Sequence, residues 1–396
     1  MKKSVLFIVS NMHTGGVSKS MTSLLNVIDT NNYDVSLLLI SSTGELMPLI
    51  PKSIKIISNP ILSALTSRFD GFIRLIKLGK PILAVMHIFR LFLSIINRSC
   101  AGRFLAWLMP SIEGEYDMIV DYNGQHQLYY MVNKLHGKKK VTFFHSDYSK
   151  WPYYYNADKK YFPKVDAIFT ISDTCVKSLQ KYFPECRDKI FKMENISSPK
   201  LINKLAQEDI DLPPFEGITL VTIGHICYNK GIDLAIEAAQ ILKKNGIKFR
   251  WIFVGKVLEK SFIDEINKLG LYDIMLFVGT KVNPYPYIHY ADIVVHPSRF
   301  EGRSIALDEV KILCKPVVVT NFSTVNDQFK NGYNASICEI NGEAIANSII
   351  ELYYNPNLMK QLSVNLKEQI VDNTSEIKFL YNIINSSNGP FYINTY

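Results

Sequence analysis

The sequence predicts an α/β protein made of two doubly wound domains, each built on a parallel sheet. Short apolar segments alternate with helical patterns along almost the whole chain, which is the order typical of parallel sheets. The alternation starts afresh near the middle, and 396 residues exceed what one hydrophobic core ordinarily holds. We therefore expect two domains that face each other across a cleft, with ligands at the carboxyl ends of their strands.

The apolar segments of the two halves are predicted as buried strands. They lie at residues 4–10, 34–40, 116–122, 140–145, 165–172, 217–224, 249–255, 274–279, 291–298 and 315–321. A polar, proline-containing linker near 205–216 separates the halves. The expected organisation is an N-terminal domain over 1–205, a second domain over 206–373, and a C-terminal segment, 374–396, that packs back on the first domain.

Composition and cysteine usage are those of a globular cytosolic protein. Apolar residues make up 47% of the chain and charged residues 20%, so neither a disordered nor a fibrous chain is indicated. The six cysteines form no CxxC pair and no metal-ligand spacing, which favours reduced thiols. The opening "MKKSVLFIVSNMH" has too short an apolar stretch for a signal peptide, and no uncharged run of about 18 residues predicts a transmembrane helix.

Positive charge is concentrated in the first half of the chain. Residues 1–200 carry 26 Lys and Arg against 15 Asp and Glu, a net charge of +11, whereas 201–396 carry 18 against 21. Within the first half, 51–110 holds nine basic residues and a single acidic residue, Asp70. A local excess of this kind indicates an anionic surface or substrate, with a solvated basic face as the alternative.

This basic segment contains an apolar helical stretch, 70–98, within a region of about 60–108. Pro81 divides the stretch into two helical patterns. In the second pattern, polar residues recur at steps of three and four, so they form one stripe on an otherwise apolar helix; they are His87, Arg90, Ser94 and Asn97. Such a helix either is buried in protein or lies at a membrane interface. We predict the membrane surface, because Arg74 and Lys77 add positive charge that suits anionic headgroups.

A pair of glycines, Gly15 and Gly16, follows the first strand and precedes a helical pattern. Paired glycines allow a tight turn, and the helix start then offers backbone amides to an anion. The spacing is neither the dinucleotide fingerprint nor a Walker A loop, so nicotinamide and ATP sites lose support. A tight strand-to-helix connection without a ligand is the alternative.

Two further segments place polar side chains after strands. His145 and Asp147 follow an apolar strand, and their side chains point the same way if the strand continues that far. A histidine at this edge suits a sugar hydroxyl or a reacting group, and a structural His–Asp hydrogen bond is the equally supported alternative.

In the second half, Lys230 and Gly231 stand at a helix start, where an ammonium and backbone amides together can neutralise phosphate.

The stretch "SRFEGRSIALDE", 298–309, follows a buried strand and therefore emerges at the carboxyl edge of its sheet. Gly302 allows close backbone approach, and Ser304 is a natural helix N-cap. The amides of Ile305 and Ala306 are then expected to point outward at the positive end of a helix, where they form a phosphate cradle.

Two carboxylates flank this expected cradle. Glu301 precedes the helix, and Glu309 lies one turn along it with a side chain that leans back toward the amino end. Carboxylates beside an anion cradle suit hydroxyl groups, so one is expected to bind the sugar and the other the ribose of a nucleotide sugar.

These motifs resemble retaining glycosyltransferases of family 4, which have the GT-B fold of two doubly wound, Rossmann-like domains. The resemblance covers most of the chain through "TGGV", "HSD", "IGHICYNKGIDLAIEA", "FVG" and the long segment 291–321. The long segment is the most specific, because it carries the paired glutamates of the family as Glu301 and Glu309. The resemblance implies that Glu301 contacts the donor sugar and Glu309 the ribose.

The same resemblance assigns roles to the other motifs. It implies that Lys230 binds the diphosphate, that His145 lies by the reacting sugar, and that the loop at Gly15 and Gly16 closes over donor phosphates or acceptor. The expected catalytic residues are His145, Lys230 and Glu301. The expected donor-binding residues are Gly15, Gly16, His225, Lys230, Glu301, Gly302, Arg303, Ser304, Ile305 and Glu309.

One position departs from the family pattern. His225 stands where the family usually has an arginine, and a neutral imidazole does not replace a bidentate guanidinium. Either His225 is protonated or another cation supplies the charge, and Arg303, where the family often has a phenylalanine, is the candidate from the sequence.

The function implied is retaining transfer of a sugar from a nucleoside diphosphate sugar, with a UDP-sugar as the first expectation. No cofactor and no metal are expected, since Lys230 and the helix amides can neutralise the diphosphate. The expected acceptor is a glycan, lipid-linked, made for capsule, exopolysaccharide or O-antigen at the inner face of the cytoplasmic membrane, and no nucleic acid is expected as a partner. The alternatives are another GT-B reaction, such as phosphorolysis or epimerisation, and a non-catalytic sugar-nucleotide-binding or scaffold protein, which His225 favours.

Overall fold

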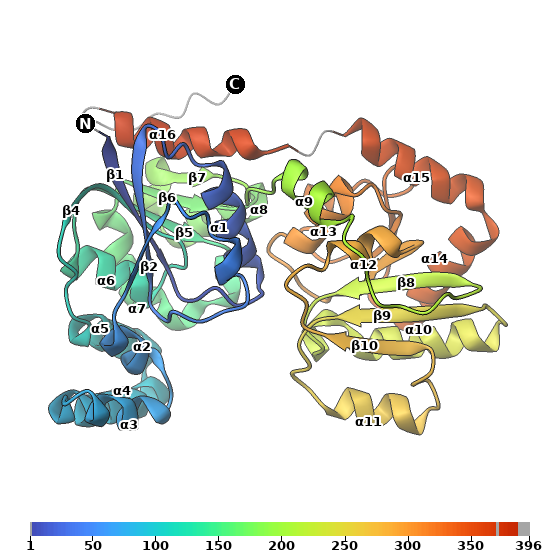
Figure 1. Ribbon diagram of the computed structural model, residues 1–396, viewed down its shortest axis with the longest axis horizontal. Helices are drawn as coiled ribbons and strands as arrows, with labels where there is room; N and C mark the ends of the chain where they lie inside the picture. Colours follow the sequence, from blue (N-terminus) through green and yellow to red (C-terminus); the bar gives the residue numbers. More distant parts are fainter. Residues whose placement is uncertain (1, 370–371, 387–396) are drawn as a thin grey trace. The chain divides into compact units, whose positions relative to one another are not determined.

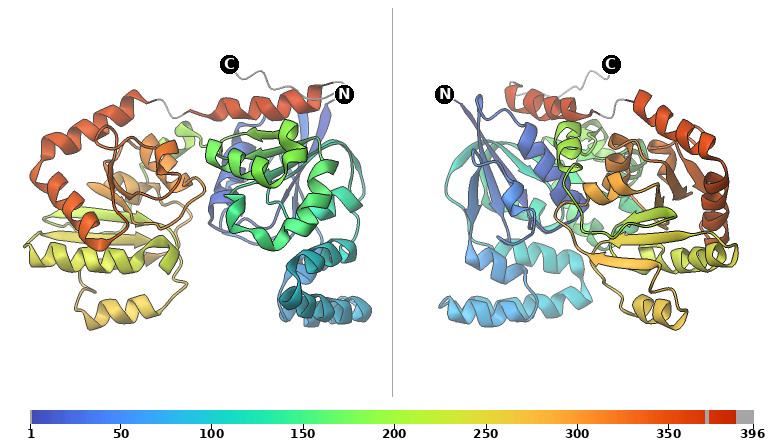
Figure 2. Two further views of the ribbon diagram at one scale, coloured as in Figure 1. Left: turned by 180° about the vertical axis from the view of Figure 1, so that it is seen from behind. Right: turned by 45° about the vertical axis from the view of Figure 1, so that its right-hand side comes forward.

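The chain folds into two units, and the computed structural model describes residues 2–369 and 372–386 (Figure 1). Unit 1 comprises 1–196 and 374–396, and unit 2 comprises 197–373. Each unit is a parallel sheet with helices on both faces (Figure 2). The predicted fold class, two doubly wound α/β domains, is therefore confirmed.

The sheet of unit 1 has seven parallel strands in the order β3-β2-β1-β4-β5-β6-β7. The strands are β1 (Lys3–Val9), β2 (Tyr33–Leu39), β3 (Lys55–Ser58), β4 (Glu115–Asp121), β5 (His136–Phe144), β6 (Ala167–Thr170) and β7 (Ile190–Lys192). The strand order reverses between β1 and β4, which makes their carboxyl ends the topological switch point where ligands of such sheets bind.

Helices cover both faces of this sheet, because alternate residues of its strands are apolar on both sides. Along β1, Leu6 and Ile8 enter one hydrophobic cluster, whereas Val5, Phe7 and Val9 enter the other. The helices are α1 (Gly16–Val27), α2 (Pro60–Thr66), α3 (Asp70–Lys77), α4 (Pro81–Ile96), α5 (Arg98–Leu108), α6 (His126–Lys134), α7 (Tyr155–Tyr161), α8 (Asp173–Tyr182) and α16 (Lys378–Asn385). Buried apolar residues of α16 join the second cluster, so the chain returns to unit 1 after unit 2.

Helix α4 is amphipathic, but its polar side packs on the protein and its apolar side is exposed. The predicted polar stripe faces the protein: His87 is buried and lies 2.8 Å from the Arg68 carbonyl oxygen, and Arg90 donates to the carbonyl oxygens of Leu65 and Ser67. The apolar side faces outward instead. The predicted division at Pro81 is confirmed, since this proline is the first residue of α4. Burial of the whole helix in protein, one of the two predicted alternatives, is wrong.

The sheet of unit 2 has six parallel strands in the order β10-β9-β8-β11-β12-β13, with its switch point between β8 and β11. The strands are β8 (Ile218–Ile223), β9 (Phe249–Val254), β10 (Met275–Gly279), β11 (Ile293–His296), β12 (Val317–Thr320) and β13 (Ser336–Cys338). The helices are α9 (Pro199–Leu205), α10 (Ile232–Lys244), α11 (Ser261–Lys268), α12 (Tyr285–Tyr290), α13 (Ile305–Ile312), α14 (Gly342–Tyr354) and α15 (Pro356–Glu368).

The boundary between the units lies at Ile196 and Ser197, upstream of the linker that composition indicates. The physical reason is that α9, which precedes that linker, packs against α12 and α13 of unit 2. The Asn283 side-chain amide fixes the end of α9 by donating to the Leu205 carbonyl oxygen at 2.8 Å.

Candidate active site

A largely buried carboxylate, Glu301, contacts three polar partners at the carboxyl edge of the unit 2 sheet; its side chain is 13% exposed. It lies in the loop that leads from β11 to α13. Its Oε1 atom pairs with the Lys230 ammonium, and it lies 3.0 Å from His296 Nε2 and 2.9 Å from Ser298 Oγ. Two residues selected from the sequence, Lys230 and Glu301, are therefore in direct contact. His296 and Ser298 were not selected, although a histidine at the end of a buried strand was a visible signal.

The loop after β8 brings Lys230 to this carboxylate. Lys230 ends a short 3-10 turn, and Gly231 follows with a φ of +68°, a conformation that favours glycine. A Cβ at Gly231 would lie 1.9 Å from the Pro297 carbonyl oxygen, so only glycine lets the two loops approach this closely. The Arg299 amide then donates to the Asn229 carbonyl oxygen at 3.0 Å, which ties the loops together. The topological switch point between β8 and β11 thus carries the candidate site.

Charge attraction keeps Glu301 ionised despite its burial. Burial alone would raise the pKa of Glu301, but the Lys230 ammonium and the bond to His296 outweigh this and lower the pKa to about 2. Burial also lowers the pKa of His296, and its contact with Glu301 offsets this only in part. At neutral pH the cluster therefore holds a carboxylate, an ammonium and a neutral imidazole.

The amino end of α13 provides an amide-lined helix start beside Glu301. Ser304 occupies the N-cap position, as predicted, but its side chain forms no capping hydrogen bond. The Gln328 side chain holds the loop instead: it accepts from the Ser304 amide at 2.9 Å and donates to the Ser304 carbonyl oxygen at 2.8 Å. The amides of Ile305 and Ala306 belong to the first helical turn, where no intrahelical acceptor exists. An anion is the natural partner of such amides.

Arg303, the candidate from the sequence for the missing diphosphate cation, pairs with the carboxylate of Asp308 in this structure. Its Nε and Nη2 atoms lie 3.1 and 3.2 Å from the two carboxylate oxygens of Asp308, and its side chain is only 7% exposed. Asp308 also accepts from Gln328 at 2.9 Å. This buried bidentate pair neutralises Arg303, so the guanidinium belongs to the scaffold of α13 in this structure.

Glu309 lies one turn into α13, as predicted, and is buried. Its Oε1 atom accepts from the Tyr285 hydroxyl at 3.0 Å, and burial together with the nearby charge of Glu309 raises the pKa of Tyr285 well above its usual value. A tyrosine hydroxyl is thus one protein partner of the carboxylate that the sequence assigns to ribose.

His225 follows β8 and Gly224, and it is neutral at pH 7. Burial lowers the pKa of its imidazole, and the cations of Lys230 and Lys256 lower it further. Protonation of His225, one of the two predicted replacements for the arginine, is therefore disfavoured. Lys256 reaches this neighbourhood because the loops after β8 and β9 run side by side, with the Ile226 amide donating to the Lys256 carbonyl oxygen at 2.9 Å. Lys256 was missed from the sequence, since only the packing of Gly255 on Gly224 brings the two loops together.

In unit 1, the Gly15–Gly16 turn is the amino end of α1. Gly15 is the N-cap residue, in an extended conformation. The loop before it is fixed by Glu45, whose carboxylate accepts from the Thr14 amide at 3.1 Å and lies 3.0 Å from His13 Nδ1. The strand-to-helix connection is thus as predicted, and it follows β1 at the switch point of unit 1.

His145 lies directly after β5, which ends at Phe144, so the premise that the strand extends to Asp147 is wrong. The predicted His–Asp alternative is not formed: Asp147 accepts from Ser178 Oγ at 2.6 Å, whereas the imidazole packs against the rings of Tyr122 and Phe143. Both ring nitrogens of His145 are buried without a well-formed hydrogen bond. Burial lowers the pKa of this imidazole to about 4.

Gln127 is a second polar group at the switch point of unit 1, and it was missed from the sequence. Its Nε2 atom donates to Ser10 Oγ at 2.6 Å, while its Oε1 atom is buried without a hydrogen bond. Buried polar atoms without partners are rare in folded proteins and mark places where a ligand or water completes the bonding. Such atoms of Gln127 and His145 suit a hydroxyl-rich ligand.

Most of unit 2 matches a known protein family. Residues 207–369 match the family model of glycosyl transferases group 1. An uncharacterized glycosyltransferase of Haemophilus influenzae is 27% identical over 176 residues, which cover 44% of this chain and 50% of that protein. The poly(ribitol-phosphate) alpha-N-acetylglucosaminyltransferase of Staphylococcus aureus is 26% identical over 234 residues, 54% of this chain and 47% of that protein. The chain thus spans about half the length of these curated relatives.

Solved structures extend the likeness to the whole fold. Staphylococcus aureus TarM, solved with UDP, has a TM-score of 0.69 at 13% identity, over 97% of this chain and all of that one. Anabaena HepE, also solved with UDP, has a TM-score of 0.63 at 15% identity, over 96% of this chain and 98% of that one. The chain therefore has the GT-B fold. Within it, unit 2 carries a glycosyl transferases group 1 domain, and the homologues of the chain are glycosyltransferases.

Proposed function

We propose that the chain is an enzyme that transfers a sugar, with retention of anomeric configuration, from a nucleoside diphosphate sugar to a glycan acceptor. The observation that carries the proposal is the cluster of Lys230 and Glu301 beside the amino end of α13, at the switch point of unit 2. Glu309, one helical turn beyond, supplies a second buried carboxylate. An ammonium, helix amides and two hydroxyl acceptors match the diphosphate and the two sugars of such a donor.

The proposed reaction depends more on stabilising the leaving group than on supplying a nucleophile from the protein. The bond from the anomeric carbon to the diphosphate oxygen breaks, the acceptor oxygen bonds to that carbon, and the acceptor proton passes to the departing diphosphate. Negative charge grows on the diphosphate as this happens. Fixed positive groups, here the Lys230 ammonium and the first amides of α13, stabilise that charge most effectively where water is excluded.

A diphosphate would compete with Glu301 for the Lys230 ammonium. In the proposed donor complex, Lys230 turns from the carboxylate to the phosphates, and Glu301 then accepts a hydroxyl of the sugar. His296 and Ser298 keep the Glu301 carboxylate oriented during this exchange, since both contact the same oxygen atom. We assign the second diphosphate cation, in place of the missing arginine, to Lys256.

A UDP-sugar is our first choice of donor, and retention is our choice of stereochemistry. The similar structures of HepE and TarM were solved with UDP. The Staphylococcus relative is named an alpha-N-acetylglucosaminyltransferase, and the kanosaminyltransferase of Streptomyces kanamyceticus is also named for an alpha product. An alpha product from the usual alpha-linked UDP-sugar would mean retention.

The acceptor is assigned to unit 1, where His145 and Gln127 present buried polar atoms. A neutral imidazole can bond a sugar hydroxyl without adding charge to the site, and burial keeps His145 neutral. We further propose that this acceptor is lipid-linked and that the reaction serves a cell-surface polysaccharide.

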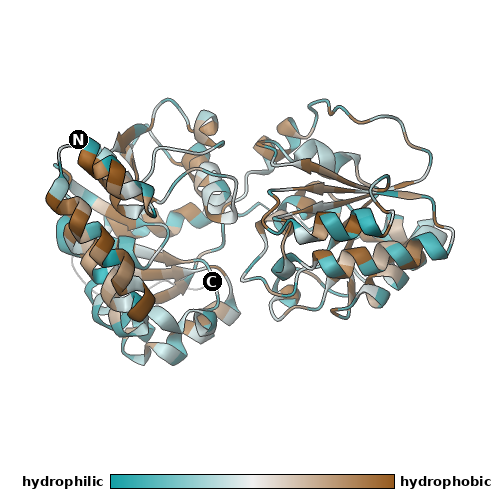
Figure 3. Ribbon diagram, turned by 90° about the horizontal axis from the view of Figure 1, so that it is seen from below, coloured by the Kyte–Doolittle hydropathy of each residue, from teal (hydrophilic) through white to brown (hydrophobic). Residues whose placement is uncertain are grey.

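The exposed face of α3 and α4 supports the lipid-linked acceptor. Of the large apolar side chains that are exposed in the described residues, a cluster lies on these two helices. Figure 3 colours the ribbon by hydropathy, with apolar residues in brown. The members of the cluster are Ile73, Ile76, Ile82, Val85, Ile88, Phe89, Phe92, Ile95 and Ile96. Exposed Arg74, Lys77 and Lys80 flank the cluster, so the face suits the anionic surface of a membrane, which we propose is the cytoplasmic one. Across residues 2–369 and 372–386, no helix meets the length and apolarity needed to cross a bilayer.

Release of nucleoside diphosphate tests the proposed activity. Purified protein is incubated with UDP-, GDP- and TDP-sugars, with and without membrane lipid extract as acceptor, and free nucleoside diphosphate is measured. We expect release from one donor that rises with acceptor and is lost in Glu301→Gln. Release that does not depend on acceptor would indicate another GT-B reaction, and no release from any donor would favour a non-catalytic role.

A further inference from the structure

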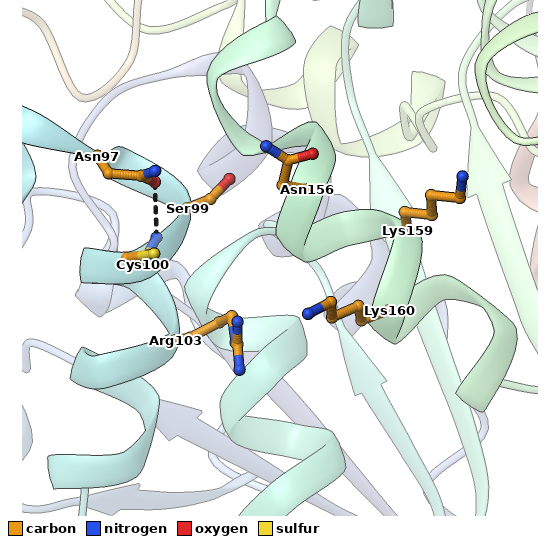
Figure 4. Close-up of a pocket in the computed structure, with 7 residues that line it drawn as sticks. All are labelled: Asn97, Ser99, Cys100, Arg103, Asn156, Lys159 and Lys160. Atoms are coloured by element: carbon orange, nitrogen blue, oxygen red, sulfur yellow. Dashed lines mark hydrogen bonds between the residues drawn. The ribbon is translucent and has the colours of Figure 1, made fainter.

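A cavity of about 330 Å³ in unit 1 lies between α5 and α7, apart from the carboxyl-edge residues described above (Figure 4). We name it the α5–α7 pocket. Its lining residues are Asn97, Ser99, Cys100, Arg103, Asn156, Lys159 and Lys160. Three of the seven are cations and none is a carboxylate, so the lining carries a net positive charge.

The side chains of Arg103 and Lys160 point toward one another from α5 and α7, and Lys159 extends away from them (Figure 4). No ion pair to any of these three cations occurs among the described residues; Lys159 stands only over the ring of Tyr155, 5.9 Å away. Like charges that face each other repel unless an anion lies between them. The geometry therefore favours a negative ligand in the pocket.

The nearest acidic residue in sequence does not neutralise this charge. Asp158 precedes Lys159, but its carboxylate turns into the core and accepts from the hydroxyls of Tyr129 and Tyr148, each at 2.6 Å. The backbone adds to the positive character instead. The pocket includes the amino end of α5, where Asn97 caps the helix by accepting from the Cys100 amide at 3.0 Å.

An apolar cavity adjoins the pocket and shares Cys100 and Arg103 with it. This second cavity, of about 480 Å³, is lined also by Leu93, Phe104, Trp107, Asn133 and Tyr161. Phe104 stacks on Trp107 with ring centroids 5.7 Å apart and meets Phe89 edge-on at 5.6 Å. Phe89 belongs to the exposed apolar face of α4, so a row of aromatic rings leads from that face to the apolar cavity that adjoins the basic pocket.

We propose that the α5–α7 pocket binds the phosphate or diphosphate at the head of a molecule with an apolar chain, and that the chain lies in the adjoining cavity against Phe104 and Trp107. A basic pocket alone would serve a free phosphate equally well. The adjoining aromatic cavity makes a lipid the better source. The inference rests on the proposed function in one respect: it identifies this molecule with the lipid-linked acceptor.

Vesicle binding tests the pocket directly. Full-length protein is sedimented with phosphatidylcholine vesicles that contain either phosphatidic acid, a phosphomonoester, or phosphatidylglycerol at matched surface charge. We expect preference for phosphatidic acid, and a loss of about thirtyfold in affinity for it in the double variant Arg103→Gln, Lys160→Gln, since each cation near an anionic surface contributes severalfold. The matched control is Lys177→Gln, Lys181→Gln, two exposed lysines on α8 of the same unit. Equal losses in the two double variants, or no loss in the first, would overturn the proposal.

Trp107 distinguishes a lipid from a free phosphate. In a Trp151→Phe background, Trp107 is the partly exposed tryptophan that reports on the cavity, because Trp251 is buried. Phosphatidic acid vesicles should shift its emission to shorter wavelength, whereas inorganic pyrophosphate should not. Pyrophosphate binding as strong as lipid binding, without a shift, would contradict the lipid assignment.

The pocket and the proposed transferase activity can fail separately. Phosphatidic acid binding needs no nucleotide, and nucleotide binding to unit 2 does not use Arg103 or Lys160. A protein that binds no nucleoside diphosphate but keeps the pocket-dependent lipid preference would refute the activity and leave the pocket in place. Nucleotide binding and sugar transfer without the pocket-dependent lipid preference would refute the pocket and leave the activity in place.

Discussion

The Lys230 ammonium and the Glu301 carboxylate form an ion pair at the carboxyl edge of the unit 2 sheet, although 71 residues separate them in sequence. Gly231 makes this approach possible, because the left-handed turn and the missing side chain let its loop contact Pro297. The pair holds an ammonium at this edge, where the Lys230 side chain is 23% exposed. The same ammonium is then available when a diphosphate enters.

Removal of Lys230 alone should destabilise unit 2. In Lys230→Met the carboxylate of Glu301 stays buried and loses its strongest partner, which costs about 3 kcal/mol in comparable buried pairs. The double variant Lys230→Met, Glu301→Gln should recover most of that loss, because no buried charge remains. Urea unfolding of the two single variants and the double variant measures the coupling. Simple additivity of the two effects would show that the pair contributes nothing.

Lys256, rather than Arg303, should contribute to nucleoside diphosphate affinity. Lys256→Gln removes a cation beside His225 and is expected to weaken binding about tenfold, since a charge-assisted hydrogen bond contributes about 1.5 kcal/mol. Arg303→Gln should instead lower stability, because it leaves the buried Asp308 without its bidentate partner. Calorimetry with the nucleotide and thermal unfolding separate the two effects. A large loss of affinity in Arg303→Gln with unchanged stability would assign the diphosphate cation to Arg303 instead. His225→Ala is the control, because it removes a neutral side chain from the same neighbourhood.

Gly231→Ala should be far more harmful than an alanine at an equivalent backbone conformation. Gly231 and Gly246 have φ values of +68° and +70°, but a Cβ at Gly246 meets no atom within 4 Å. Gly246→Ala should therefore cost only the left-handed strain, about 1 kcal/mol. Gly231→Ala adds a clash with Pro297, so we expect a larger fall in melting temperature and the loss of nucleotide binding. Equal melting temperatures for the two variants would contradict the close approach of the loops.

Titration of His145 should contribute a loss of stability to unit 1 in mild acid. Its pKa is about 4 in the folded protein and 6.5 ordinarily, so between these values the unfolded chain binds more protons. The contribution is complete above pH 6.5 and is lost as the pH falls toward 4, by up to about 3 kcal/mol. His145→Phe keeps the ring contacts and removes the titration. As the pH falls over this range, the unfolding free energy of wild type should fall relative to that of the variant. The contribution of Asp121, whose raised pKa acts in the opposite direction, is the same in both proteins and cancels.

The sequence was sufficient for the fold class and for the local positions of Glu301, Ser304 and Glu309, for a physical reason. Glu301, Ser304 and Glu309 are close in sequence, so local rules of strands and helix starts place them correctly. The central strands are continuous apolar runs that only a sheet covered on both faces explains. The short edge strands β3, β7 and β13 escaped prediction, because runs of three or four residues carry no distinct period.

Long-range contacts were beyond the sequence. Nothing local shows that Asp308 captures Arg303, that Gln328 replaces the Ser304 capping bond, or that Lys256 approaches His225, since each depends on how separate loops pack. The sequence did not predict that the polar stripe of α4 faces the protein. The periodicity identifies the polar stripe but not which side of the helix faces the protein.

Calorimetric titration with UDP, GDP and TDP tests the central claim most directly, that the carboxyl edge of unit 2 is a nucleoside diphosphate site. The titrations are made on wild type, Lys230→Met and Glu309→Ala, with folding of each variant verified by circular dichroism. We predict saturable binding of one nucleotide, UDP, that is lost in Lys230→Met and weakened about tenfold or more in Glu309→Ala, which loses the acceptor for ribose. Binding of none of the three by folded wild-type protein, or undiminished binding by folded Lys230→Met, would contradict it.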